Sequence, residues 1–257
     1  MSTTTLRTTT LIGDIATVCG RELRPVLRDP FSVIFSMVQP LFFLALFAPL
    51  LPDTVGSGDS LQWFVPGVVL MSCLFGTSAT GANLLSEMHT GAHERMLVSP
   101  LRRSALIIGR ALKEIVPTLV QTAVIVAATV PFGFDLHLAG ASVGLLVVAV
   151  FCVGLGALSY ALALAARKQE WMFWAVQQTF IFPLLLLAGV LLPIDGGPGW
   201  LVALSRVNPL TYVVTAERAL FNGEIATAAV AAGALAATAT AVLGLAVGIR
   251  MMERSAT

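Results

Sequence analysis

Two histidines spaced four residues apart are the first candidates for chemistry in this chain. His89 and His93 would share one face of a helix, and the carboxylates of Glu87 and Glu94 lie beside them in sequence. A zinc site needs three or four converging ligands, and the H-E-x-x-H pattern needs its glutamate directly after the first histidine. Thr90 occupies that position here. We therefore predict a polar loop and no metal site.

Other catalytic chemistries lack the groups that they require. The sequence contains no G-x-x-x-x-G-K-[ST] pattern, the loop that cradles nucleotide phosphates. An intramembrane hydrolase is the alternative from a different class, but the apolar stretches described below offer serines and threonines without histidine, aspartate or glutamate. The cysteines, Cys19, Cys73 and Cys152, are isolated and are expected to pack as small apolar side chains. We predict no catalytic site and no cofactor in this chain.

The elements that must position these residues are six long stretches without Asp, Glu, Lys, Arg or His. Each is at least as long as the ~20 apolar residues that carry an α-helix across a bilayer. The composition agrees, since 57% of the residues are hydrophobic and 11% are charged, against ~25% charged in typical soluble domains. The charge-free stretches are Phe31–Pro52, Ser60–Ser86, Ile115–Phe134, Leu138–Ala166, Trp171–Ile194 and Ile225–Ile249.

These stretches predict the fold class. Backbone groups in a bilayer must bond within the protein, and no stretch alternates polar and apolar residues, so helices are favoured over a β-barrel. We predict an all-α polytopic membrane protein with one membrane domain at 31–250, a cytoplasmic segment at 1–30 and a tail at 251–257. The six expected transmembrane helices span about residues 31–52, 60–86, 112–134, 138–166, 171–194 and 225–249.

The basic residues predict which side faces the cytoplasm. Thirteen of the fifteen lysines and arginines lie before the first stretch, between the second and third, between the fourth and fifth, or after the sixth. Only Arg206 and Arg218 fall on the other side. The positive-inside rule therefore places both termini in the cytoplasm. The first 30 residues lack the ~7–15-residue apolar run of a signal peptide, so we expect the first span to be retained.

The segment before the first span predicts an amphipathic helix between Leu11 and Asp29. Three arginines occupy one face, and Asp29-Pro30 is expected to end the helix before the chain turns into the membrane. Such a helix lies in the membrane interface with its arginines near anionic headgroups. Its apolar residues recur at steps of three and four: Ile12, Ile15, Cys19, Leu23 and Val26.

The connection Glu87–Glu114 is the most polar part of the chain. Pro100 divides its short apolar patches. A short amphipathic helix in this connection would present Met96, Leu97 and Leu101 to a groove on a partner protein. This connection is predicted to be a docking element and not an active site.

Two parts of the sequence carry a family resemblance. The run from Glu94 through Arg110, Glu-Arg-Met-Leu-Val-Ser-Pro-Leu-Arg-Arg-Ser-Ala-Leu-Ile-Ile-Gly-Arg, resembles the cytoplasmic loop of ABC-2 type transporter permeases. A second match comprises Leu187–Pro193, Pro198–Leu201 and Asn208–Tyr212. Together they resemble the daunorubicin-resistance branch, a family of drug exporters, over nearly the whole chain.

The resemblance implies the ABC-2, or type V exporter, permease fold in the cytoplasmic membrane of a bacterium. The chain would be the membrane half of an exporter for a hydrophobic or amphipathic small molecule, paired with a second permease chain, identical or related. Two separate ATPase subunits would bind ATP and Mg, and no nucleic acid is expected as a partner. The residues expected to couple the permease to its ATPase are Glu87, Gly91, Glu94, Arg95, Leu97, Ser99, Pro100 and Arg102.

The interiors of the spans suggest the kind of substrate. They hold amides and aromatic rings but no charge, which weighs against an ion-coupled transporter and favours a large, mostly apolar molecule. The alternative for each amide is a helix-to-helix hydrogen bond. The resemblance places spans 1 and 5 at the dimer interface, which favours a pathway along Phe35, Gln39, Phe42, Phe43, Asn83, Gln177, Gln178 and Phe180.

The sixth span and the connection before it are predicted to contain a close helix contact and short helices. Gly244-x-x-x-Gly248 in an alanine-rich span predicts close helix packing. The long connection Pro193–Glu224 offers helix starts at Asn208-Pro209 and at Gly197-Pro198. In the family this region forms short re-entrant helices that gate the outer side. That role is expected of Gly189, Pro193, Trp200, Asn208 and Pro209.

One alternative remains open within transport. A related ABC-2 permease could export a lipid-linked glycan or another lipid, and the absence of charge in the spans does not decide against it. In either case the energy for transport must come from another polypeptide.

Overall fold

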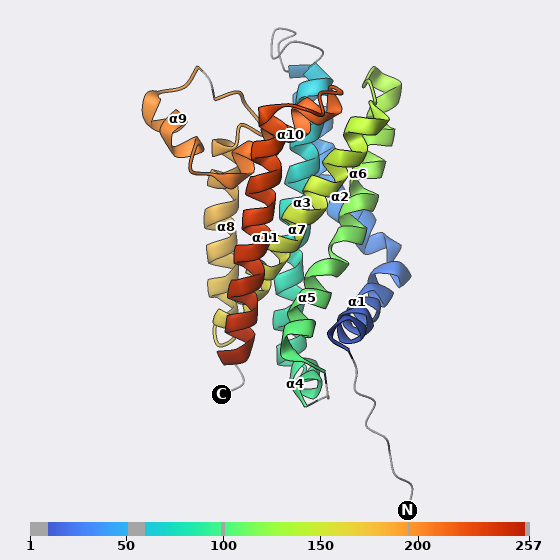
Figure 1. Cartoon of the computed structure of the whole chain (residues 1–257), viewed down its shortest axis with the longest axis vertical. Coiled ribbons are helices and arrows are strands. Elements are labelled where there is room, and N and C mark those ends of the chain that lie inside the picture. The colour runs from blue at the N-terminus through green and yellow to red at the C-terminus, as the bar shows by residue number, and fades with distance from the viewer. Residues whose placement is uncertain (1–9, 51–59, 99–100, 195, 255–257) are drawn as a thin grey trace, which may run out of the picture.

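The computed structural model describes residues 10–50, 60–98, 101–194 and 196–254, and the secondary structure in these ranges consists of helices joined by turns and loops, with no strand (Figure 1). Two short 3-10 segments, Ala48–Leu50 and Val130–Phe132, extend α2 and α6. The predicted all-α class is thereby confirmed. The helices are α1 (Leu11–Arg28), α2 (Pro30–Phe47), α3 (Ser60–His89), α4 (Ala92–Leu97), α5 (Arg103–Lys113), α6 (Ile115–Thr129), α7 (Leu138–Ala165), α8 (Glu170–Leu187), α9 (Gly199–Ser205), α10 (Pro209–Phe221) and α11 (Ala228–Arg254).

Among the described residues, four helical stretches have the length and hydropathy to cross a membrane. They are α3, the α5–α6 pair taken as one stretch over Arg103–Phe132, α7 and α11. α2 contributes a shorter apolar run, Ile34–Phe47. α8 has 18 residues, a length of roughly 27 Å. The stretch Arg103–Phe132, which corresponds to the third predicted span, begins nine residues before the predicted limit of about residue 112.

The helices divide the molecule into two distinct ends (Figure 1). α1, α4 and the end of α11 lie at one end, and α9 and α10 lie at the other. The long helices run between these ends, with α3 and α7 in the middle of the bundle. The first helix and the end of the last helix therefore lie at the same end of the bundle.

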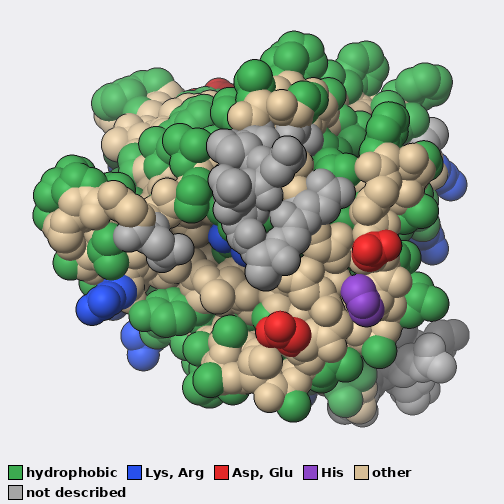
Figure 2. Space-filling view, turned by 90° about the horizontal axis from the view of Figure 1, so that it is seen from above, with side chains coloured by type: hydrophobic (Ala, Val, Ile, Leu, Met, Phe, Trp, Pro, Cys, Tyr) green, Lys and Arg blue, Asp and Glu red, His purple; other side chains and the backbone are tan. Residues whose placement is uncertain are grey.

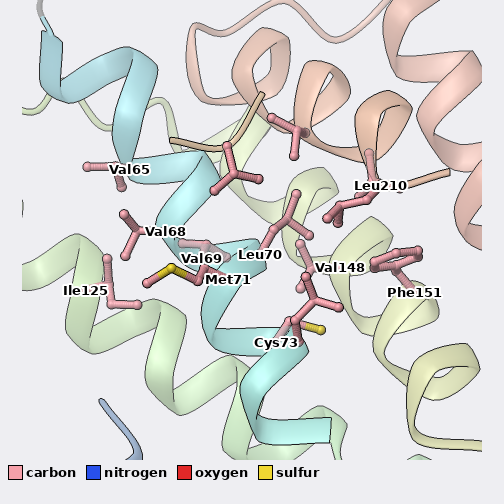
Figure 3. Close-up of a cluster of buried hydrophobic side chains, with 14 of the residues drawn as sticks. Val65, Val68, Val69, Leu70, Met71, Cys73, Ile125, Val148, Phe151 and Leu210 are labelled. Atoms are coloured by element: carbon pink, nitrogen blue, oxygen red, sulfur yellow. The ribbon is translucent and has the colours of Figure 1, made fainter. Parts of the chain in front are cut away.

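α3 forms the centre of the apolar core. Its middle is buried all round, and Val69, Leu70 and Met71 pack against Ile125 of α6 and Phe151 of α7 (Figure 3). A helix that is apolar on every face is stable only when other helices or lipid surround it. Its central position explains why this helix has so few exposed side chains.

α7 and α11 approach each other through glycine, as the small-residue pattern predicted. A Cβ atom on Gly154 would lie 2.6 Å from the backbone nitrogen of Ala241, and one on Gly244 would collide with the carbonyl oxygen of Gly154. Gly248 extends the contact to Ala157, whose carbonyl oxygen would lie 3.2 Å from an added Cβ atom. This backbone-to-backbone contact fixes α11 against α7.

Two predicted helix boundaries are confirmed by backbone geometry. α1 ends at Arg28 and α2 begins at Pro30, with the amide of Asp29 bonded to the carbonyl of Pro25. Asn208 caps α10, because its side-chain oxygen accepts a hydrogen bond of 3.0 Å from the amide of Leu210.

Candidate functional site

The short helix α4 lies at the end of the molecule that carries α1 and the end of α11 (Figure 1). Gly91 precedes it with φ +68°, a left-handed conformation that glycine adopts without strain. Glu94, Arg95 and Val98 are exposed on its outer side. Met96 was predicted to face a partner protein, but it is buried. It packs in a core cluster of this chain that includes Val18 of α1 and Leu106 of α5. The exposed side chains described on α4 are therefore charged, and the apolar Val98 follows directly after the helix.

Arg110 of α5 joins α4 to the rest of the bundle. Its side chain is 1% exposed. Its Nε lies 3.4 Å from a carboxylate oxygen of Glu22 on α1, and its Nη2 donates a hydrogen bond to Glu87 at the end of α3. The same nitrogen is 3.9 Å from the sulfur of Met96 on α4. On the remaining side the guanidinium carbon lies 5.7 Å from the ring centroid of Tyr160 on α7. One side chain thus contacts four other helices.

Lys113 and Glu114 extend this group of charges toward the membrane. The Lys113 Nζ is 3.9 Å from Glu22 and 3.5 Å from Glu114, and all three side chains are buried. We call the set Glu22, Glu87, Arg110, Lys113 and Glu114 the buried charge cluster. The cluster was not predicted from the sequence, because charged residues that flank a charge-free span are usually solvated loop residues.

α1 packs on α5 with a face that includes acidic residues. Asp14, Val18 and Glu22 are buried, whereas the predicted apolar residue Ile12 is exposed. The contact is close, since a Cβ atom on Gly109 of α5 would lie 2.8 Å from Val18. The spacing of four residues between the buried positions was visible in sequence, but two of them are acidic and were not considered core.

A groove of about 400 Å³ runs between α1 and α4 on this end of the molecule. It is lined by Arg21 of α1 and by Ala92, Arg95, Met96 and Leu101. Arg21 and Arg95 are exposed at its rim. A groove with an apolar floor and two cations suits an acidic segment of another protein.

Of the remaining predicted coupling residues, Arg102 is described by the structure, whereas Ser99, Pro100 and the side chain of Leu97 are not. The backbone amide of Arg102, the residue before α5, donates to the buried carboxylate of Asp14 at 3.5 Å. The side chain of Leu97 and the residues Ser99 and Pro100 lie outside the described part of the structure. Glu87, Gly91, Glu94 and Arg95 are placed as stated above.

Of the predicted histidine pair, the structure describes the side chain of His89, whereas that of His93 lies outside the described part. His89 lies at the end of α3, with its Nδ1 3.9 Å from a carboxylate oxygen of Glu170 on α8. Both side chains are more than half exposed. Among described residues, no group of three His, Cys, Asp or Glu side chains comes close enough to hold a metal ion.

The predicted substrate-pathway residues lie on α2, α3 and α8. Phe43 stacks on Phe47, with ring centroids 5.4 Å apart. α2 and α8 bury few of their side chains, so much of their apolar surface is uncovered in the single chain. The pathway residues that are exposed are Phe35, Gln39, Phe42, Asn83, Gln178 and Phe180.

Gln177 takes part in helix-to-helix bonding. Its side-chain oxygen accepts a 3.0 Å hydrogen bond from Ser78 of α3, and its nitrogen donates one of 3.1 Å to Ser159 of α7. Gln121 of α6 similarly donates to Ser36 of α2 at 2.7 Å. The structural alternative weighed for the amides is confirmed for these two.

The opposite end of the molecule carries α9 and α10, and hydrophobic and uncharged polar side chains dominate this face (Figure 2). Asn208 donates to the carbonyl of Leu184, which attaches the start of α10 to α8 at 2.8 Å. Arg218 donates to the carbonyl of Gly189 at 2.7 Å and lies 3.7 Å from the ring centroid of Trp63. Gly189 itself has φ +66°, so it makes the turn after α8.

The other predicted gate residues are exposed near the contacts of Asn208 and Arg218. Pro193 lies on the connection after α8, Trp200 is 68% exposed on α9, and Pro209 occupies the first turn of α10. The predicted helix start at Gly197-Pro198 is confirmed, because α9 follows at Gly199.

Glu217 is a buried acid on α10 that was not predicted from the sequence. Its side chain is fully buried, and neither carboxylate oxygen has a hydrogen-bond partner. It faces Gly144 of α7, where a Cβ atom would lie 3.3 Å from the carboxyl carbon. α10 lies outside the four membrane-length stretches. Burial disfavours the ionised carboxylate and raises the pKa of Glu217 to about 8.

Because of Glu217, the stability of the protein is expected to fall as pH rises from 4.5 to about 8. The folded state keeps a proton that the unfolded state releases in this window, so the stabilisation is complete below the unfolded pKa and is lost toward the folded pKa. The loss approaches about 1.4 kcal/mol per pH unit. Melting temperatures measured across this window should fall less steeply for Glu217→Gln than for the wild type. The exposed Glu224→Gln is the control, and parallel slopes for all three proteins would contradict the assignment.

Comparison with known proteins agrees with this arrangement. Residues 14–222 match the ABC-2 type transporter family. The daunorubicin resistance ABC transporter permease protein DrrB1 of Streptomyces coeruleorubidus is 26% identical over 218 residues, covering 83% of this chain and 77% of that protein. The probable doxorubicin resistance ABC transporter permease protein DrrC of Mycobacterium tuberculosis (strain H37Rv) is 25% identical over 206 residues, covering 76% and 72%.

A relative with a different name has similar coverage. The putative transport permease ycf38 of Cyanophora paradoxa is 28% identical over 202 residues, covering 76% of this chain and 69% of that protein. The family match extends from the buried face of α1 to the end of α10 and includes the whole α4 region. The chain therefore belongs to the ABC-2 type transporter family, as a membrane-embedded permease related to the drug-resistance permeases.

Proposed function

We propose that this chain is the permease subunit of an ABC exporter that moves a hydrophobic or amphipathic small molecule out across the cytoplasmic membrane. The observation that carries the proposal is the connection from the exposed side of α4, through Met96 and Arg110, to α1, α3 and α7. A push on α4 would move these helices together, because protein interiors are closely packed and transmit displacement.

The energy source would be a separate pair of ATPase subunits, which bind ATP and Mg. Their docking site would be the exposed surface of α4, with Glu94 and Arg95, together with the groove between α1 and α4. An acidic segment of the ATPase would complement Arg21 and Arg95 at the rim of this groove. This end of the molecule would face the cytoplasm, with both termini on that side, and the membrane would be that of a bacterium.

A second permease chain would cover the exposed apolar surfaces of α2 and α8. These helices would be the first and fifth of six spans, and their length of 18 residues each supports that reading. Their exposed aromatic residues, including Phe35, Phe42 and Phe180, would then line a path for an apolar substrate. α9 and α10 would close that path on the outer side.

Drug accumulation in living cells tests the proposed export. The chain and its ATPase would be expressed together and separately in a drug-sensitive bacterium, and the cellular content of a fluorescent anthracycline would be measured. Lower accumulation is expected only with both proteins. Higher accumulation with both would indicate import, and unchanged accumulation would contradict drug export.

Reversing the charge of Glu94 is expected to weaken docking of the ATPase. We propose that Glu94 contacts a basic group of the ATPase, so Glu94→Arg should cut drug export by about tenfold, the effect of losing a contact of roughly 1.4 kcal/mol and adding repulsion between like charges. Because Glu94 is exposed, the fold should be unaffected. The measurement is co-purification with the ATPase, together with export. Glu253→Arg, an exposed charge on α11, serves as control, and wild-type co-purification and export by Glu94→Arg would refute the assigned docking surface.

A further inference from the structure

Two cavities meet where α2 passes α6, close to the end of α1. The outer cavity, of about 290 Å³, is lined by apolar side chains of α1, α2 and α6. The inner cavity, of about 100 Å³, is lined mainly by polar side chains of α2, α3 and α6. Both include Val26 and Pro117 in their walls, so the cavities adjoin at these residues. We call this pair of cavities the α2–α6 window.

The outer cavity opens toward the surroundings of the chain. Leu27, Ile34, Val120 and Val124 line it and are themselves exposed. In a membrane-embedded permease such a surface contacts hydrocarbon. Since α1 ends beside it, the outer cavity lies in the half of the bundle nearest α4. A hydrocarbon chain could therefore enter it from the adjacent leaflet.

The inner cavity offers polar groups to a molecule that passes the window. The hydrogen bond from Gln121 to Ser36 crosses between α6 and α2 and forms part of its wall. Asn83 of α3 lines the same cavity and is exposed. Lys113 and Glu114 supply charged groups that are more than nine-tenths buried. Buried polar side chains at the end of an apolar channel are typical of sites that orient an amphipathic ligand.

The buried charge cluster reaches the inner cavity through Lys113 and Glu114, and it holds unequal numbers of positive and negative groups. Glu114 and Lys113 lie 3.5 Å apart in its wall. Lys113 also lies 3.9 Å from Glu22, and Arg110 pairs with both Glu22 and Glu87. Three carboxylates thus share two cations. The cluster is electrostatically complementary to one further positive charge, which it would attract strongly away from bulk water.

We propose that the α2–α6 window binds an amphiphile with a positively charged ammonium head. The head would enter the inner cavity beside Glu114, and the hydrocarbon would lie in the outer cavity against Val120 and Val124. This inference rests on the proposed function, because it names where and by what chemistry the exporter takes up an amphipathic substrate. It does not require the exposed faces of α2 and α8 to form the binding site.

Competition binding tests the window. The full permease with its ATPase, in maltoside micelles without ATP, would be titrated with a dansyl-labelled alkylamine that keeps its free ammonium. Dodecylamine should displace this probe about tenfold more tightly than dodecanol, since a charge-assisted contact contributes roughly 1.5 kcal/mol or more. Glu114→Gln should remove most of that difference. Equal affinities of dodecylamine and dodecanol for the wild type would overturn the proposal.

Two further variants keep the test decisive. Glu217→Gln makes the same substitution in a buried acid that lines neither cavity and should leave both affinities unchanged. Val124→Trp fills the outer cavity from an exposed position that tolerates a large side chain, and it should weaken both amphiphiles. If Glu114→Gln fails to fold, wild-type binding by Val124→Trp overturns the proposal by itself. Identical dodecylamine affinities of Glu114→Gln and Glu217→Gln would also overturn it.

Two further questions are answered by separate results: which molecule supplies the ammonium head, and whether a failed test refutes the window or the proposed export function. Phosphatidylethanolamine added to the micelles should displace the probe if membrane lipid supplies the head, whereas no displacement supports a small molecule of other origin. Either result is interpreted only if Glu114→Gln weakens dodecylamine binding.

The binding test and the export assay distinguish the two proposals. If the window test fails while the cells still export drug with the ATPase present, only the window is wrong. If binding behaves as expected but export is absent, the proposed function is wrong.

Discussion

Replacing Arg110 with methionine is expected to reduce ATP-driven export by about tenfold or more and to lower the melting temperature. The substitution leaves the buried carboxylate of Glu22 and the partly exposed carboxylate of Glu87 without their shared cation. Removing one partner from a buried ion pair typically costs about 3–5 kcal/mol, because the remaining charge is left uncompensated. The methionine also loses the contact with Tyr160. α1, α3 and α7 would then no longer be joined at one point.

The variant Arg110→Lys separates position from charge. Lysine keeps the charge but lacks the planar fork with which Arg110 reaches Glu22 and Glu87 on two different helices. We expect a small change in melting temperature and a large loss of export, while ATP hydrolysis by the complex continues. Such uncoupling would not arise from a residue that only stabilises the fold.

The matched control for Arg110 is Arg103, an exposed arginine on the same helix. Arg103→Met should leave melting temperature and the ratio of transport to hydrolysis at wild-type values. Wild-type coupling in Arg110→Lys, or equal losses in the variants at both positions, would contradict the role given to the buried charge cluster.

Replacing Gly244 with alanine is expected to destabilise the protein by about 3 kcal/mol or more, at the upper end for overpacking. An added methyl group would collide with the carbonyl oxygen of Gly154 on α7. The obstacle is backbone, which cannot rotate away as a side chain can, so α7 and α11 must separate. The measurement is the melting temperature and the yield of folded protein in detergent.

Gly20 provides the control, because the same substitution there should have the opposite sign. Gly20 lies in α1, and an added Cβ atom would meet nothing within 4 Å. Glycine within a helix usually costs about 0.5–1 kcal/mol relative to alanine, so Gly20→Ala should stabilise slightly. A Gly244→Ala protein as stable as Gly20→Ala would show that α7 and α11 do not pack as described.

Sequence patterns predicted those parts of the fold that depend on local chemistry. The charge-free runs predicted helices because a bilayer leaves few other backbone structures. Asn208 and Asp29-Pro30 predicted helix boundaries because capping and proline act on their immediate neighbours. Gly244 and Gly248 predicted a close helix contact, although only the structure identified α7 as the partner.

Burial of polar groups could not be predicted in this way. Arg110 and Glu22 are 88 residues apart in sequence, and nothing local indicates that they meet. Charged residues at the edge of a span are usually solvated, so the cluster was interpreted as part of a loop. Glu217 was overlooked for the same reason, since its burial depends on Gly144 in a distant helix. Met96 was assigned outward because its place beneath Arg110 is set by tertiary contacts.

The central claim is that this chain moves the substrate, whereas a separate ATPase binds and hydrolyses the ATP that drives transport. The most direct measurement uses purified proteins in liposomes and records ATP hydrolysis and drug accumulation together. We expect neither activity from the permease alone, and both from the permease with its ATPase and Mg-ATP, with accumulation on the side opposite α4. ATP hydrolysis by the permease alone, free of contaminating ATPase, would contradict the account, as would ATP-independent accumulation.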